Sequence, residues 1–141
     1  SCLQTIDGGA GPTPSDVRFL SNTLYSTSTV QFDGVTIGAA STSIEVKNNL
    51  GYAPNNASSV MVTDLSSAAS VATNSSNAQL RGTSPLFSST PTTSATQLSA
   101  TDFKITSGSY AIDYATYSAS VLRDFMDVAR TTPHDIGAVQ A

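Results

Sequence analysis

A nine-residue pattern occurs twice in this chain. Residues 17–25 (VRFLSNTLY) align with residues 44–52 (IEVKNNLGY), so that apolar, Asn and Tyr positions coincide. A repeat of roughly 20 to 50 residues with alternating apolar positions is typical of a solenoid, in which each turn covers the open edge of its neighbour. The repeat therefore predicts stacked coils of about 27 residues each.

The apolar residues at the start of each copy predict a strand with one buried face. Val17 and Phe19 lie two residues apart in the first copy, as do Ile44 and Val46 in the second. Side chains two residues apart on a strand point to the same side. We expect all four to point into the interior of the coils.

One asparagine follows this strand in each copy, where the coil is expected to turn. If adjacent coils stack at the spacing of neighbouring strands, about 4.8 Å, Asn22 and Asn49 lie one above the other and can hydrogen-bond along the stack. The alternative is that each asparagine only occupies a turn. We interpret the pair as a structural ladder.

The composition also favours stacked strands over a disordered stalk. The chain has 23 Ser and 19 Thr, together 42 of its 141 residues, and only 39% hydrophobic residues. Short hydroxyl side chains on this scale are found in disordered stalks and on the outer faces of β-solenoids. Regularly spaced Val, Ile, Phe and Tyr are not expected in a stalk, which favours the solenoid.

The charge balance limits the classes of partner. Six basic residues stand against ten acidic ones, giving a net charge of −4. Nucleic-acid binding is not expected, because its affinity depends on clustered cationic residues. Nor is a strongly anionic polysaccharide expected to be held by charge, which leaves a neutral or weakly charged glycan. No stretch approaches about 18 apolar residues, so no membrane-spanning helix is expected.

The remaining segments divide the chain into residues 1–82, the coils, and residues 83–141, an irregular excursion followed by a cap. Residues 29–37 and 59–63 read as strands, the first broken by a turn at Asp33-Gly34. Residues 66–77 have no clear period and are expected to be irregular. Residues 115–129 carry apolar residues at near-helical spacing, which on its own predicts an amphipathic helix.

The C-terminal part carries short motifs in a fixed order. They are SPLF at 84–87, DFKI at 102–105, GSYAID at 108–113, DF at 124–125, an arginine at 130 and DIGAV at 135–139. This series resembles the closing part of secreted right-handed parallel β-helix proteins of the pectin-lyase-like family. The resemblance implies an all-β fold, a right-handed parallel β-helix with C-terminal coils and a capping segment. For residues 115–129 it implies a loop followed by a strand, which we favour over the helix that the spacing predicts. It also implies an extracellular, cell-surface or virion-surface location and glycan-directed work, as in polysaccharide lyases, glycoside hydrolases and phage tailspikes.

A parallel solenoid that stopped without cover would expose unpaired backbone groups and an open apolar interior. The apolar residues of the C-terminal motifs are suited to covering it. We expect the interior to be plugged by Phe87, Phe103, Ile105, Ile112 and Ile136.

The polar residues of the C-terminal part invite a catalytic interpretation. They include Asp113, Asp124, Arg130, His134 and Asp135. Acid-base catalysis requires groups held across a cleft with perturbed pKa values, and closeness in sequence does not establish this. We favour a structural network, in which Arg130 bridges carboxylates and Asp135 accepts turn N–H groups. No catalytic residue and no cofactor are therefore expected. No metal site is expected either, since no spacing matches a calcium loop.

Two hypotheses of function follow. The first is a non-catalytic, structural and glycan-contacting part of a surface or virion appendage, in which exposed Tyr25 and Tyr52 are either sugar-stacking platforms or ordinary outward aromatics. The second is a fragment of a polysaccharide lyase or glycoside hydrolase whose active site lies upstream. We expect the chain to begin in mid-coil and to end at its natural C-terminus. Its expected partners are preceding coils of the same parent protein, a glycan and, in an oligomer, further copies of itself.

Overall fold

The computed structural model describes residues 3–5, 12–66, 69–72, 75–76, 84–88, 99–116, 120–139 and 141. Its elements are β1 (Leu3–Gln4), β2 (Arg18–Leu20), β3 (Thr23–Tyr25), β4 (Asp33–Ile37), β5 (Ile44–Lys47), β6 (Leu50–Tyr52), β7 (Val60–Asp64), β8 (Ala69–Ala72), β9 (Ser75–Ser76) and a short 3-10 helix, η1 (Ala100–Phe103). The expected boundary between residues 82 and 83 and most of the excursion, residues 89–98, lie outside the described residues.

The strands form three parallel sheets in a repeating order. The sheets are β1-β4-β7, β2-β5-β8 and β3-β6-β9, so the chain visits all three before returning to the first. β2 pairs with β5 and β3 pairs with β6, with Arg18 opposite Glu45 and Tyr25 opposite Tyr52. In both pairings the opposed residues are those that the sequence repeat aligns. The described strands thus form a β-rich structure of parallel sheets, and the predicted register is confirmed.

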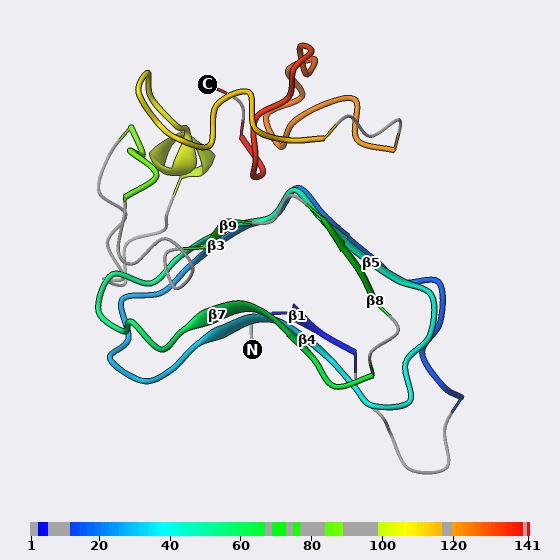
Figure 1. Cartoon of the computed structure of the whole chain (residues 1–141). Helices are drawn as coiled ribbons and strands as arrows, with labels where there is room; N and C mark the ends of the chain where they lie inside the picture. Colours follow the sequence, from blue (N-terminus) through cyan, green and yellow to red (C-terminus); the bar gives the residue numbers. More distant parts are fainter. Residues whose placement is uncertain are drawn as a thin grey trace.

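The three sheets face a shared apolar interior (Figure 1). Val35 and Ile37 of β4 and Ile44 and Val46 of β5 are buried there, while Phe19 packs against them. The sequence prediction of inward-facing apolar residues in β2 and β5 is therefore confirmed. No strand buries an apolar face by itself, and the core exists only because all three sheets contribute to it.

Left-handed residues form the corners on either side of the second sheet. Asp16 and Ser43 precede β2 and β5 with φ of 56° each, and Ser21 and Asn48 follow these strands with φ of 51° and 57°. The two members of each pair are separated by one length of the repeat. Short polar side chains tolerate this backbone region better than bulky ones because they can hydrogen-bond locally. The corners are thus encoded at equivalent places in the two copies.

Two local predictions were wrong. Asp33 and Gly34 belong to the continuous strand β4 and make no turn there. Within residues 66–77, β8 and β9 continue the second and third sheets, with Ile44 opposite Ala69 and Leu50 opposite Ser75. The offset in these pairings is shorter by two than that between the first two coils, so the third coil departs from the period of the repeat. Backbone pairing in a parallel sheet does not require the side-chain pattern to be repeated.

The region from residue 115 to 129 has no helix among its described residues. An antiparallel bridge joins Arg123 to Ala129, and another joins Ala115 to His134. Both are contacts of extended chain, in agreement with the loop-and-strand interpretation. The near-helical spacing of apolar residues misleads here because Leu122, Phe125 and Met126 are exposed.

We define the C-terminal segment as residues 84–88, 99–116, 120–139 and 141. It lies outside the space enclosed by the sheets, alongside β3 and β9 (Figure 1, green at residues 84–88 and yellow to red from residue 99). Leu50 of β6 forms a second apolar cluster with Ile105, Ala111 and Ile136, and Phe87 and Ile112 pack against this cluster. Ile105, Ile136, Phe87 and Ile112 were expected to plug the interior, and that expectation was wrong, because all four belong to or pack against this second cluster. The physical reason is that Leu50 and its neighbours on the outer face of the third sheet are apolar and need cover of their own.

Gly34 gives a direct test of how closely the coils stack. A Cβ at this position would lie 2.7 Å from the Met61 carbonyl oxygen and 3.1 Å from the Leu24 side chain. Gly34→Ala should lower the free energy of unfolding by about 1 to 3 kcal/mol, because the backbone of β7 must move. Urea unfolding measures the loss, with exposed Gln31→Ala as the control. If the urea midpoint of Gly34→Ala equalled that of the parent chain, the close contact between β4 and β7 would be contradicted.

Candidate functional site

The corner asparagines form a hydrogen-bonded pair between two coils. Asn49 Oδ1 accepts from the backbone N–H of Asn22 at 2.9 Å and from Asn22 Nδ2 at 2.8 Å. Asn49 Nδ2 donates to the Phe19 carbonyl at 2.8 Å. The side chain of Asn49 is fully buried, so these bonds form where no water competes. The structure thus brings the two predicted ladder residues into direct contact.

Asn49→Ala should be strongly destabilising, because it leaves the Asn22 N–H without its acceptor. Loss of a buried partner costs about 1 to 3 kcal/mol per group, so we expect a loss of at least about 2 kcal/mol. Asn55→Ala is the matched control, since Asn55 also donates from Nδ2 to a preceding coil, to Thr27 O at 2.7 Å, but is exposed. The control should lose less than about 1 kcal/mol in urea unfolding. Equal losses would mean that burial of the ladder is unimportant.

The tyrosines that the repeat aligns are stacked on each other and covered. The rings of Tyr25 and Tyr52 have centroids 6.0 Å apart. Phe87 meets both edge-on, at 6.3 and 6.2 Å, and Phe103 meets Tyr25 at 6.1 Å. Burial raises the pKa of Tyr25, and the neighbouring Tyr52 raises it further. Both tyrosines were expected to be exposed and are half-buried, because phenylalanines of the C-terminal segment pack against them, while their contact with a glycan stays a prediction.

Tyr110 extends this aromatic region on the C-terminal side. Its hydroxyl is buried, with no hydrogen-bond partner among the described residues. Burial, followed by the effect of Tyr52, raises the pKa of Tyr110 to about 12. A phenol that is this reluctant to ionise is unsuited to act as a general base at neutral pH.

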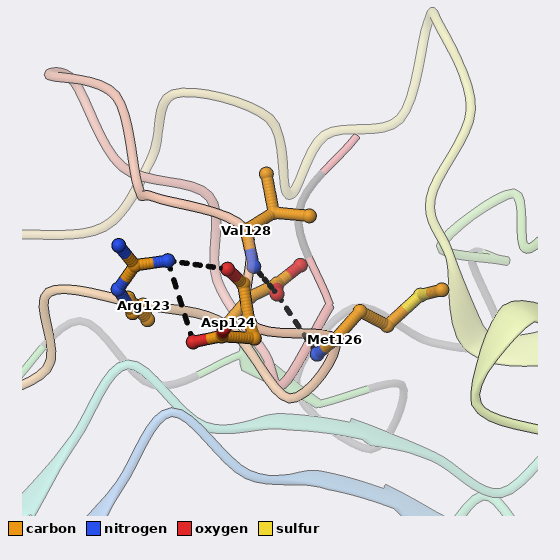
Figure 2. A network of polar contacts seen from close by, with 5 residues as sticks. Arg123, Asp124, Met126 and Val128 are labelled. Carbon is orange, nitrogen blue, oxygen red and sulfur yellow. Dashed lines mark hydrogen bonds and ion pairs between the residues drawn. The ribbon is translucent and has the colours of Figure 1, made fainter.

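Asp124 organises the tight hairpin at residues 123–129 (Figure 2). Its Oδ1 accepts from the backbone N–H groups of Met126 at 2.9 Å and Val128 at 2.8 Å. Arg123 pairs across the same hairpin with Asp127, at 3.3 Å between Nη1 and Oδ1. Asp124 is 9% exposed. Its carboxylate therefore serves the fold of the loop that carries it.

Asp135 has a similar role in the last residues of the chain. It is 2% exposed, and its two carboxylate oxygens accept from the backbone N–H groups of Asp113 at 2.9 Å and Ala141 at 2.7 Å. This is the arrangement predicted for Asp135. Asp113 enters the network through its backbone, with a left-handed φ of 58°, and its side chain is exposed.

Arg130 binds backbone carbonyls. Its Nη1 donates to Asp135 O at 3.1 Å and its Nη2 to Gly137 O at 2.6 Å, while Nε is buried without a partner among the described residues. Burial lowers the pKa of Arg130, and the charges of Asp124 and Asp135 oppose that shift. The predicted bridging of carboxylates is thus replaced by two carbonyl contacts that fix residues 135–137.

His134 is buried beside this network, with 4% of its surface exposed. Burial lowers the pKa of His134, the Arg130 charge lowers it further, and Asp135 acts in the opposite direction. Its backbone carbonyl accepts from Ala115 N at 2.8 Å. The surroundings of His134 thus favour the neutral imidazole over the charged form.

The five polar residues predicted to form a network lie in one region of the structure. Their hydrogen bonds hold the backbone of the C-terminal segment. The oxygens of Asp124 and Asp135 receive backbone N–H groups, and the guanidinium of Arg130 is directed at carbonyls. Among the described residues, no three His, Cys, Asp or Glu side chains are placed to hold a metal ion. What the arrangement can do is hold the C-terminal segment in one conformation.

Sequence reasoning missed the residues that attach this segment to the coils. Asn48 donates from Nδ2 to Thr116 O at 2.7 Å and accepts at Oδ1 from Thr116 N at 3.1 Å. Thr23 Oγ1 accepts from Ala138 N at 2.9 Å, and Gly137 N donates to Asn48 O at 3.0 Å. The available signal was the repeat alignment, which places Asn48 opposite Ser21 as an extra amide at a corner.

Comparison with family models, with curated proteins and with solved structures finds no match for this chain. The function must therefore be argued from the residues and their contacts. In the part of the chain that the structure describes, no helix has the length and apolar character needed to cross a membrane.

The environment of His134 predicts a pH dependence of stability. Its pKa in the fold lies below the ordinary 6.5. Between that lowered value and about 6.5, the unfolded chain binds a proton that the folded chain does not, so stability falls as pH falls through this range. The urea midpoint should be lower at about pH 5.5 than at about pH 7.5. His134→Gln should reduce this difference, and a variant with the same slope as the parent chain would refute the assignment.

Proposed function

We propose that this chain is a C-terminal part of a right-handed parallel β-helix and serves as a non-catalytic, structural and glycan-contacting module of an extracellular or virion-surface protein of tailspike or adhesin type. The architecture is supported by three parallel sheets visited in rotation and by the Asn22–Asn49 pair. The motif series at residues 84–139 supports the family assignment.

Stacking onto a preceding coil of the same parent protein is the first expected interaction. In the described ladder, the side-chain oxygen of an asparagine accepts hydrogen bonds from the asparagine of the coil before it. Asn49 Oδ1 accepts in this way from the backbone N–H and the side-chain amide of Asn22. No described residue donates to Asn22 Oδ1, which is therefore suited to accept from one more coil. β2 and β3 also lie at the edges of their sheets. A second copy of the chain stacking at this edge is the corresponding oligomeric arrangement.

The observation that supports a non-catalytic role best is the use of the acidic side chains. Asp124 and Asp135 accept backbone N–H groups of their own segment through their carboxylates, so these oxygens are engaged in holding the fold. His134 is buried beside them. A general acid or base must be within hydrogen-bonding reach of the substrate proton, which these positions do not favour.

The proposal predicts glycan binding without turnover. The chain would be incubated with neutral and acidic polysaccharides, and the products assayed for new reducing ends and for unsaturated sugars. Binding of a neutral glycan with no product is the expected outcome, with Asp124→Asn and His134→Gln carried in parallel. Turnover by the parent chain that either variant abolishes would overturn the proposal in favour of a polysaccharide lyase or glycoside hydrolase.

A further inference from the structure

A hollow of about 340 Å³ lies between the first coil and the C-terminal segment. Asn22 and Thr23 line it from the start of β3, Ser99 and Phe103 from η1 and its cap, and Phe125 from the hairpin. Its volume is near the lower end of ligand sites, roughly 300 to 1,000 Å³. The hairpin and the last residues of the chain also contribute to the lining, through Phe125, Ala138 and Val139, but neither Asp124 nor Asp135 lines it.

Two aromatic rings give this hollow an apolar side. Phe125 is 77% exposed, the largest exposed fraction among the large hydrophobic residues described, and Phe103 is half-buried. The backbone N–H of Phe125 donates to Ala138 O at 2.8 Å, and Ala138 N donates to Thr23 Oγ1 at 2.9 Å, so the backbone that carries the ring is anchored beside β3. An exposed aromatic ring that lines a hollow offers a flat face for stacking.

Three polar side chains give the hollow a hydrogen-bonding side. Thr23 Oγ1 accepts from Ala138 N, which leaves its own proton to donate. Asn22 uses one of its amide protons for Asn49, and Ser99 caps η1 by accepting from Thr101 N. A purely apolar ligand would leave the Thr23 hydroxyl proton and the second Asn22 amide proton without an acceptor, at a cost in free energy.

Charge limits the ligand further. None of the described residues that line the hollow is charged, and the chain as a whole carries a net charge of −4. The charged residues Arg123, Asp124 and Arg130 line a neighbouring hollow of about 260 Å³, which Phe125 also lines, and not this one. The lining therefore fits a neutral molecule that has both an apolar face and hydroxyl groups.

We propose that this hollow binds one residue of a neutral sugar chain, with the C–H face of the ring on Phe125 and its hydroxyl groups directed to Asn22, Thr23 and Ser99. The inference rests on the glycan-contacting part of the proposed function and gives it a location. Tyr25 and Tyr52 are poorer platforms, because Phe87 and Phe103 pack against them.

The test uses the full chain and a set of neutral oligosaccharides built from glucose, mannose, galactose and N-acetylglucosamine. Saturation-transfer NMR identifies a binder, and titration gives its Kd. Phe125→Ala should raise that Kd about fivefold, the effect expected for loss of one aromatic stacking contact. Leu122→Ala is the matched control, because Leu122 is 57% exposed in the same part of the chain and does not line the hollow.

Each outcome decides a different point. A Kd raised by Phe125→Ala and left within about twofold by Leu122→Ala supports the site, provided both variants unfold at the parent temperature. Binding that Phe125→Ala leaves unchanged, or that both variants weaken equally, overturns this location while the glycan-contacting function stands. No binding by any oligosaccharide overturns both the location and the glycan contact, but not the stacked-coil architecture. A change in sedimentation of Phe125→Ala without a change in Kd would overturn the location as well and make Phe125 a contact between copies.

Discussion

The register between parallel strands is the constraint on which the rest of the structure depends. Arg18 lies opposite Glu45 and Tyr25 lies opposite Tyr52. Residues at equivalent positions of the two repeats are therefore neighbours across the paired strands. Apolar residues then meet in the interior, and Asn22 meets Asn49 at the corner. A slip of one residue in a strand would exchange its inward and outward faces, and the buried amide would lose its partner. The polar ladder and the apolar core thus support the same register.

The outer face of the third sheet is the second determinant of the fold. Leu24 points into the core, so that Thr23 and Tyr25 of the same strand face outward, and the C-terminal segment covers them. Leu50 adds an apolar anchor on that face. The acidic and basic residues of the C-terminal segment then have a structural purpose, because a long irregular segment must satisfy its own backbone groups when it is laid over a sheet. Asp135 and Arg130 do this with charge-assisted hydrogen bonds.

The sequence predicted the parts of this structure that repeat. The alignment of the two copies was sufficient for the register, the inward residues and the contact between Asn22 and Asn49. It could not reveal β8 and β9, because the pairing offset shortens there and parallel backbone pairing leaves little trace in the side chains. The sequence also could not predict that Ile105 and Ile136 pack on the outer face of the third sheet. An apolar residue in an irregular segment gives no indication of which apolar surface it will cover, whether the interior of the coils or Leu50 outside them.

The lateral packing of the C-terminal segment has a consequence for the order of folding. The coils can begin to stack as soon as the first two copies of the repeat are available, since their contacts join neighbouring turns. The packing of Leu50 against Ile136, however, can form only after Ile136 has been synthesised. The hydrogen bond from Ala138 N to Thr23 Oγ1 likewise requires Ala138. Contacts across such long stretches of sequence form slowly. During synthesis, the third sheet therefore displays a bare apolar face until the last residues of this segment emerge, and that interval is when a nascent chain is most exposed to association with its own kind.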